Sequence, residues 1–472
     1  MKRDIVGYLP VNIIQAVAAM ALVAVFSRLL TTEEYGRYAV AFAATQLAQG
    51  LIFYWLHASV ARFHEAARRD GRLAEHLSTT YVALAVLSLA SIALSVVAFA
   101  LWPTHTGLVA AAVAALVTRS AMTVGLETHR AARDPRRYSY LEATQHFLSI
   151  SVGVLLVAAM GLREAAPLIG IAVANALCLL IDLPAMARMA GGFAPRRDTL
   201  DQFARYGVAA SVSMLLAIAL VTVDRFVIGW LIGDAAIGLY AVAFALADRP
   251  LSIIFGWIGM SVMPVAVMAM ERGGAAEARA VMVRNSKILL FLTLPAATGL
   301  AMIAEPMAAL LAGPEFQGPA AQLVPWLALA GVLHGFANHF AAHPFLLLKR
   351  TDLLARTMAL ACVAMLVLNI ALLPVMGLAG AVVASVGAHL VVLVARLIWA
   401  SRIGLPAPID LPTAAKALAA CVVMALVIDA VPHPSGALAL AILIPVGAAS
   451  YAAAALVLDV AGCRTMIRRG AR

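Results

Sequence analysis

Six ionisable side chains stand inside long apolar stretches of this sequence, and their types define the chemistry available to the chain. They are three arginines and three aspartates: Arg119, Arg225, Arg249, Asp182, Asp224 and Asp248. The donor fork of an arginine binds phosphate oxygens bidentately, whereas a buried aspartate can carry a proton or pair with a cation. Because a charge in an apolar environment costs about 2.5–3.5 kcal/mol, each position indicates either a polar cavity or an ion pair between helices. The sequence leaves both interpretations open.

A second set of polar side chains lies in one apolar segment, residues 320–347. His334 and Asn338 are near its middle, where they could contact hydroxyl groups of a bound molecule. His339 and His343 are four residues apart and would share one face of a helix, as two metal ligands do. No carboxylate or cysteine nearby completes a metal site, so we predict no metal and no cofactor. Lining of a polar cavity, or hydrogen bonding between helices, fits these side chains better.

Composition predicts the elements that must position these residues. Of the 472 residues, 64% are hydrophobic and 12% are charged, and the mean hydropathy is +0.95. Soluble domains are about 45–50% apolar and about 25% charged, so a soluble enzyme, a secreted disulfide scaffold and a disordered chain are excluded. The fold class that remains is an all-α polytopic membrane protein. In such a protein the net charge of +10 reflects arginines in loops, and no nucleic-acid partner is expected.

Windows of about 20 apolar residues predict fourteen transmembrane helices. Their approximate limits are 5–27, 38–60, 80–102, 107–128, 139–160, 165–187, 207–232, 236–267, 286–311, 320–347, 357–376, 379–400, 412–431 and 436–459. With a cytoplasmic amino terminus, 28 of the 34 lysines and arginines fall on the cytoplasmic side, three on the other side and three inside spans. One missed or extra span would disrupt this alternation, so the positive-inside rule predicts that both termini are cytoplasmic.

Two short stretches of the chain are nearly identical. Gly36–Ala43 reads GRYAVAFA and Gly238–Ala245 reads GLYAVAFA, six predicted spans later. An even number of spans keeps the two copies in the same orientation, which predicts two pseudo-symmetric six-helix lobes in a parallel repeat, as in many transporters. The predicted organisation is an N-terminal lobe at 1–190, a cytoplasmic linker at 191–206, a C-terminal lobe at 207–402, and an appended helix pair with a basic cytoplasmic tail at 403–472.

Three further stretches carry a family signal. They are Ser27–Tyr38 (SRLLTTEEYGRY), Asp224–Gly233 (DRFVIGWLIG, continuing to Ile237-Gly238-Leu239-Tyr240) and Ala309–Phe316 (ALLAGPEF). In this order they resemble the polysaccharide and oligosaccharide-lipid flippases, the Wzx-like branch of the multidrug/oligosaccharidyl-lipid/polysaccharide exporter superfamily. The fourteen spans and the six-span repeat agree with that family, so the resemblance covers the whole chain.

The resemblance implies a transporter of the bacterial cytoplasmic membrane. Members of the family move a polyprenyl-diphosphate-linked oligosaccharide from the inner to the outer leaflet for O-antigen, capsule or exopolysaccharide synthesis. Alternating access coupled to an ion gradient is the expected mechanism, and membrane lipids, a polysaccharide polymerase and glycosyltransferases are the expected partners. The residues expected to bind diphosphate or glycan are Arg119, Arg249, Arg225, His334 and Asn338. The candidates for ion coupling are Asp248, Asp182 and Asp224.

Two alternatives lie in other functional classes. A multidrug or organic-cation antiporter of the same superfamily would use the membrane aspartates to bind its substrate. A membrane enzyme, such as a glycan polymerase, would need a catalytic constellation outside the membrane, and the predicted outer loops of about ten residues or fewer leave little room for one. The phosphate-binding pattern GxxxxGK[ST] is absent, which argues against ATP hydrolysis. We therefore expect that the chain is not an enzyme.

Overall fold

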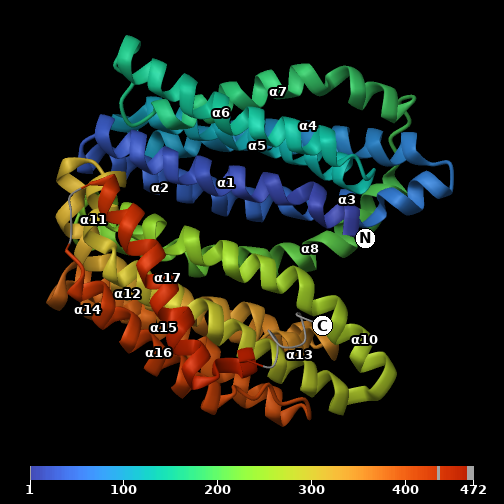
Figure 1. Cartoon of the computed structure of the whole chain (residues 1–472). Coiled ribbons are helices and arrows are strands. Elements are labelled where there is room, and N and C mark those ends of the chain that lie inside the picture. The colour runs from blue at the N-terminus through green and yellow to red at the C-terminus, as the bar shows by residue number, and fades with distance from the viewer. Residues whose placement is uncertain (1, 433–435, 465–472) are drawn as a thin grey trace. The chain divides into compact units, whose positions relative to one another are not determined.

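The computed structural model describes residues 2–432 and 436–464, with the side chains of residues 2–13, 16 and 260 excepted. Every regular element in this part is a helix, which confirms the predicted all-α class (Figure 1). The predicted basic tail at 465–472 lies outside the described residues. Contacts divide the chain into two compact units, Met1–Phe226 and Val227–Arg472.

The first unit is built from eight α-helices and two short turns of other helical types. They are α1 (Lys2–Leu29), α2 (Thr32–Ala48), the π-helical turn η1 (Gln49–Phe53), α3 (Tyr54–Arg69), α4 (Leu73–Leu101), the 3-10 turn η2 (Pro103–His105), α5 (Thr106–Ala131), α6 (Pro135–Met160), α7 (Ala166–Ala190) and α8 (Arg197–Leu220). Helix α9 (Val223–Leu231) contains the boundary between the units.

The second unit continues with long helices that are interrupted by short ones. They are α10 (Asp234–Met302), α11 (Ala304–Leu311), α12 (Pro314–His339), α13 (His343–Leu347), α14 (Thr351–Met376), α15 (Leu378–Arg402), α16 (Leu411–Ala430), α17 (Ala437–Leu458) and the 3-10 turn η3 (Val460–Gly462). The last two α-helices are the predicted C-terminal pair, and they pack against each other.

Twelve helical segments of the described chain are long and apolar enough to cross a membrane. Helix α1 adds a shorter apolar segment, Val17–Leu29. Helix α10, with 69 residues, covers the span predicted at 236–267 and most of the span predicted at 286–311, whose last part lies in α11. A non-helical Gly274 (φ 65°, ψ −152°) interrupts α10 between the two spans. The multi-span architecture is therefore confirmed, while the count of fourteen stays a prediction.

The predicted repeat is visible in the helices of the two units. Gly36 and Gly238, which open the two similar stretches, each lie four residues after the first residue of their helix, α2 or α10. Helices α5 and α12 both have 26 residues, as do α6 and α14, and α7 and α15 both have 25. In each unit the last two of these helices pack against one another. The units therefore repeat one order of long helices.

Helix α8 packs in the first unit, although its sequence was assigned to the second lobe. It begins at Arg197, inside the predicted linker, and lies against α3. The hydroxyl of Ser59 donates a hydrogen bond to the carbonyl of Phe203 at 3.1 Å. A Cβ atom at Gly207 would lie 2.2 Å from the carbonyl oxygen of Trp55, so only glycine permits this approach of the two backbones.

Candidate substrate and ion sites

Arg119 lies in the middle of α5. Its guanidinium carbon is 5.5 Å from the centre of the Phe42 ring on α2, and the side chain is half-buried. A cation over an aromatic face gains about 0.5–2 kcal/mol, more where water is excluded. The contact therefore holds this charge against α2 at mid-helix depth.

Further polar side chains lie on the same packed helices, α2 with its continuation η1, and α5. The hydroxyl of Thr123 donates to the carbonyl of Arg119 at 2.8 Å and accepts from the side-chain amide of Gln49 at 3.3 Å. Gln46 Oε1 and Ser120 Oγ are buried and have no hydrogen-bond partner in the described part of the chain. We call these five residues the Arg119 cluster. Buried polar atoms without partners indicate a place where water or a polar ligand completes the bonding.

The π-helical turn η1 joins α2 to α3 directly beside this cluster. Gln49 is its first residue, and Gly50 follows where a Cβ atom would lie 2.8 Å from Ile218 Cδ1 of α8. One turn after η1 ends at Phe53, His57 Nε2 lies 3.1 Å from the carbonyl oxygen of Ser120. Single π turns occur frequently at functional sites because the extra residue re-aims the side chains that follow.

Asp182 lies in a separate network in the first unit. Its carboxylate is 1% exposed and lies 2.7 Å from His129 Nε2, while Arg137 Nε donates to it at 2.6 Å. These three side chains come from α7, α5 and α6, and they connect the three helices. An aspartate with two basic partners in this geometry has the form of an interhelical ion pair.

Asp224 and Arg225 interact with each other at the start of α9. Arg225 Nη1 lies 3.9 Å from Asp224 Oδ1 and donates to the carbonyl of Val221 at 2.6 Å. The backbone N–H of Arg225 donates to Asp224 Oδ1 at 2.8 Å. An acidic side chain in the first turn also complements the positive end of the helix dipole. The geometry is that of a local ion pair at a helix start.

In the second unit the most deeply buried cation is Arg396 of α15, with 0% exposure. Its Nε donates to Thr357 Oγ1 at 3.1 Å, and its Nη1 donates to the carbonyl of Ala337 at 2.7 Å and to Asn338 Oδ1 at 2.9 Å. Its Nη2 is buried and has no partner among the described residues. Arg396 stands only four residues before the predicted end of its span, 379–400, so it is among the 28 lysines and arginines that the sequence assigns to the cytoplasmic side.

Two histidines lie beside this arginine. The side-chain amide of Asn338 is 3.1 Å from His334 Nε2, and the rings of His334 and His389 meet edge to face at 4.9 Å. His389 Nδ1 lies 2.7 Å from the carbonyl oxygen of Ser385, while its Nε2 is buried and has no partner in the described chain. We call His334, Asn338, His389 and Arg396 the Arg396 cluster. His334 and Asn338, which the sequence selected, thus lie together with His389 and Arg396.

Asp248 and Arg249 differ from the other predicted charges. Asp248 is half-buried, accepts a hydrogen bond from Ser252 Oγ at 3.0 Å and interacts electrostatically with His389. Arg249, the next residue of α10, is exposed. Within the described residues neither takes part in an ion pair. Asp248 is therefore the predicted ion-coupling aspartate whose charge is not neutralised by a basic side chain in contact.

The predicted sharing of one helix face by His339 and His343 is wrong. Helix α12 ends at His339, Phe340 leaves the helical conformation (φ −136°, ψ −66°), and His343 begins α13. The i, i+4 rule applies only to a continuous helix, and this one is broken between the two residues. No group of three metal-ligating side chains occurs in the described part of the chain.

Glu142 of α6 is a buried acid that is absent from the residues predicted from the sequence. It accepts from Gln15 Nε2 at 2.5 Å and from Gln145 Nε2 at 2.8 Å, and it lies 3.5 Å from His146 Nε2. It stands only three residues inside its predicted span, and no local signal in the sequence marks it. Its partner from α1 could not be found from sequence spacing.

The chain is similar to known proteins in sequence and in fold. A family model described as "Polysaccharide biosynthesis protein" matches residues 25–321. No curated protein sequence matches the chain at a significant level. The fold is similar to that of the lipid II flippase MurJ in an inward closed conformation, with a TM-score of 0.76, 13% identity, and 99% of this chain and 100% of that chain covered.

Two transporter structures are also similar. An inward-facing multidrug resistance MATE family transporter of the MOP superfamily gives a TM-score of 0.67 and 16% identity over 82% of this chain and 93% of that one. A MOP superfamily transporter from Pyrococcus furiosus gives a TM-score of 0.63 and 16% identity over 85% of this chain and 95% of that one. At these identities the likeness establishes the fold.

Proposed function

Because this chain belongs to the family of polysaccharide biosynthesis proteins, we propose that it moves a polyprenyl-diphosphate-linked oligosaccharide between membrane leaflets. The direction is from the inner to the outer leaflet of the bacterial cytoplasmic membrane, by alternating access coupled to an ion gradient. The product serves surface polysaccharide synthesis, so the chain works with the glycosyltransferases that build its substrate and the polymerase that uses it. A fold similar to that of a lipid flippase and of MATE transporters supports this proposal.

The observation that carries the proposal is the Arg119 cluster. A half-buried arginine stands in the middle of a membrane-crossing helix. Buried oxygen atoms of Gln46 and Ser120, on the packed helices α2 and α5, have no partner within the described residues. A diphosphate offers oxygen acceptors to the arginine fork, and the sugar hydroxyls next to it offer donors to such oxygens. In this proposal Arg119 binds the diphosphate, while Arg249, Arg225, His334 and Asn338 remain further candidates for contacts with diphosphate or glycan.

Asp248 is the proposed coupling residue. Its neighbour His389 interacts with it electrostatically, and the buried Nε2 of His389 lacks a partner among the described residues. An aspartate close to an imidazole can gain or lose a proton when an ion gradient changes its protonation. Asp182 and Asp224 already have basic partners in contact, which makes them weaker candidates for coupling.

The same pairing weighs against an organic-cation antiporter. Such a protein needs carboxylates that are available to a cationic substrate, and two of the three predicted aspartates are in contact with an arginine. The proposed substrate is therefore anionic. The antiporter stays the alternative that the transport assay below distinguishes.

Transport by purified protein in vesicles tests the proposal. A fluorescent polyprenyl-diphosphate oligosaccharide is placed in one leaflet, and its appearance in the other is followed with a membrane-impermeant quencher while an ion gradient is imposed. We expect Arg119→Ala to reduce the rate roughly ten- to hundred-fold, because a hydrogen bond to a charged group contributes about 1.5–3 kcal/mol. Arg119→Lys keeps the charge but loses the fork, and should recover only part of the rate.

Arg163→Ala is the matched control. Arg163 pairs with Glu34 at 2.6 Å on a surface position that is 55% exposed, so its loss should leave the rate unchanged. Transport by Arg119→Ala at the wild-type rate would remove Arg119 from the mechanism. Export of organic cations by the wild type, without movement of the lipid-linked sugar, would replace the flippase with the antiporter.

A further inference from the structure

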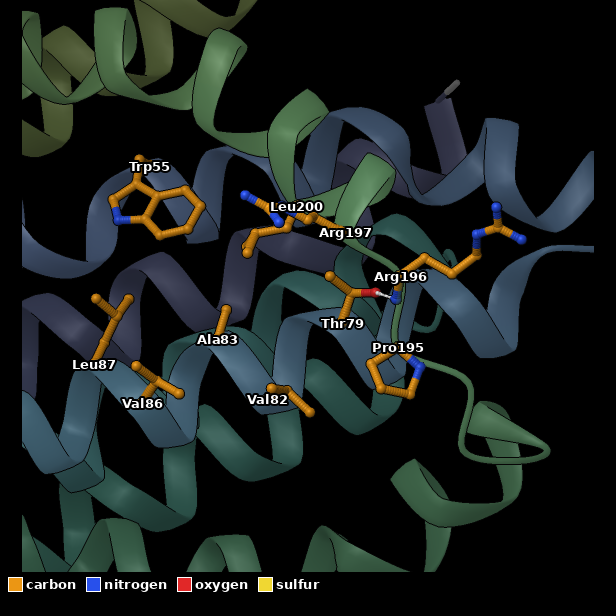
Figure 2. A pocket seen from close by; sticks show the side chains of 10 residues that line it. All are labelled: Trp55, Thr79, Val82, Ala83, Val86, Leu87, Pro195, Arg196, Arg197 and Leu200. Atoms are coloured by element: carbon orange, nitrogen blue, oxygen red, sulfur yellow. Dashed lines mark hydrogen bonds between the residues drawn. The ribbon is translucent and has the colours of Figure 1, made fainter.

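A groove in the first unit lies between α3, α4 and the start of α8, outside both clusters described above. Its volume is about 370 Å³ (Figure 2). Figure 2 shows Thr79, Pro195 and Arg196 at one end of the groove and Trp55 and Leu87 at the other. Between these ends the wall is made by side chains of α4 such as Val82 and Val86. The groove is therefore polar at the Thr79 end and apolar along the rest of its length. Two arginines flank it: the Arg196 side chain extends outward at the polar end, and Arg197 lies beside Leu200 between the two ends (Figure 2).

Hydrogen bonds fix the backbone at the polar end of the groove. The backbone N–H of Arg196 donates to Thr79 Oγ1 at 2.9 Å, and the N–H of Ala194 donates to Ser78 Oγ at 3.1 Å. The hydroxyl of Ser78 in turn donates to the carbonyl of Gly192 at 3.1 Å. Main-chain atoms of the segment that precedes α8 are thus hydrogen-bonded to side-chain hydroxyls of α4. Substitution of the arginine side chains leaves these bonds intact.

The charges of the two arginines that flank the groove are only partly neutralised. Arg196 pairs with Asp198 at 3.1 Å, but the two side chains are 55% and 85% exposed, and such surface pairs contribute about 0–1 kcal/mol. Arg197 is also exposed, and its side chain makes no hydrogen bond or ion pair with other described residues. It begins α8, whose first turn has no side-chain cap, so the positive end of the helix dipole adds to the same field. The net charge of these three side chains is positive.

The apolar wall continues beyond the groove along α4. Val82, Val86 and Leu89 occupy one face of the helix at spacings of four and three residues, and their exposed fractions are 38%, 59% and 67%. From Thr79 to Leu87 the helix rises by about 12 Å at 1.5 Å per residue, and this direction leads from the polar helix start toward the middle of the span. Such a surface matches a hydrocarbon chain that descends from an anionic headgroup.

We propose that this groove binds an anionic phospholipid of the leaflet that faces the predicted cytoplasmic side, with the phosphate at Arg196 and Arg197 and one acyl chain along Val82 and Val86. A purely apolar ligand would leave the arginine charges without a counter-charge. A free phosphate would leave the apolar wall uncovered. The site is separate from the proposed transport pathway residues, so it does not depend on the proposed function.

Native mass spectrometry of the full chain in detergent tests the site with phosphatidylglycerol and phosphatidylcholine that carry identical acyl chains. The wild type should bind phosphatidylglycerol more tightly. The double variant Arg196→Ala/Arg197→Ala should bind it roughly thirty-fold more weakly, which corresponds to about 2 kcal/mol at about 1.4 kcal/mol per tenfold change. Its binding of phosphatidylcholine should not change.

Two further variants keep the test specific. Val86→Trp narrows the apolar part without a change of charge and should weaken binding of both lipids. Arg205→Ala removes an exposed charge from α8 outside the groove and should have no effect. Equal binding of the two lipids by the wild type, or an equal loss in Arg205→Ala and the double variant, would overturn the proposal. Displacement of the lipid by inorganic phosphate, or by polyprenyl phosphate at equal concentration, would also overturn it, by assigning the site to a free anion or to the transported lipid.

Discussion

At the scale of single residues, the structure divides the charges inside the helices by their partners. Asp182 is enclosed by His129 and Arg137, and Asp224 pairs with the adjacent Arg225. Asp248 instead has a hydroxyl partner, Ser252, at 3.0 Å. A paired carboxylate stays ionised and stabilises helix packing, whereas an unpaired one responds to changes in its surroundings.

Substitution of Asp248 tests this distinction. We expect Asp248→Asn to fold and to move substrate at the rate that the wild type shows without an ion gradient, because the amide cannot exchange a proton or hold a cation by charge. Transport in vesicles with and without the gradient measures the effect. Glu271→Gln, at an exposed position of the same helix, is the matched control and should keep the full response. A gradient response in Asp248→Asn equal to that of the wild type would make Asp248 a structural residue.

At the scale of elements, close helix packing depends on glycines at defined positions. A Cβ atom would lie 2.4 Å from the carbonyl oxygen of Ser149 at Gly170 of α7, and 2.5 Å from that of Leu372 at Gly380 of α15. The repeated helix pairs α6–α7 and α14–α15 thus use the same device. Gly207 does the same between α8 and α3, which explains why α8 packs in the first unit.

The substitution Gly207→Ala should therefore destabilise the protein. The added methyl group meets backbone atoms of Trp55, which cannot rotate away, so α8 must shift; overpacking of this kind costs about 1–3 kcal/mol. Thermal unfolding in detergent, followed by tryptophan fluorescence, should show a lower midpoint. Gly299→Ala in α10 is the control, because no atom lies within 4 Å of its added Cβ. The two variants should not unfold at the same temperature if the packing is as described.

At the scale of the whole molecule, the two units repeat one order of helices. The similar stretches at Gly36 and Gly238 begin at equal distances from their helix starts, and three later helices match in length. The predicted parallel orientation assigns both copies the same direction across the membrane, as expected when an even number of spans separates them.

Labelling of single cysteines by a membrane-impermeant thiol reagent tests this orientation in intact cells. In a variant with its four cysteines replaced by alanine, cysteine is placed at Glu33 or Asp70, which stand at opposite ends of the segment from α2 to α3. The equivalent positions in the second copy are Ala235 and Arg272. We expect labelling at 33 and 235 and protection at 70 and 272. A parallel repeat is ruled out if 33 and 235 label from opposite sides.

Sequence alone predicted more of the architecture than of the sites. The charged and apolar residues set the membrane class and the helical segments, since the bilayer requires every spanning backbone group to bond within its own helix. The sequence predicted the sites less completely. It indicated His334 and Asn338 together, but not Arg396 and His389, which complete their cluster. Arg396 acquires its role from Ala337, 59 residues earlier in the chain, and no local pattern marks that contact.

The sequence by itself determined that this protein is a helical membrane protein of repeated design, because hydropathy, loop charge and short motifs are local properties. Tertiary structure alone decided which charges are paired, where α12 breaks between His339 and His343, and that α8 belongs with the first unit. Those outcomes depend on the rotation of each helix and on which helix it packs against. A rotation of one residue, about 100°, moves a side chain from a cavity to a neighbouring helix, and only the packed structure settles that choice.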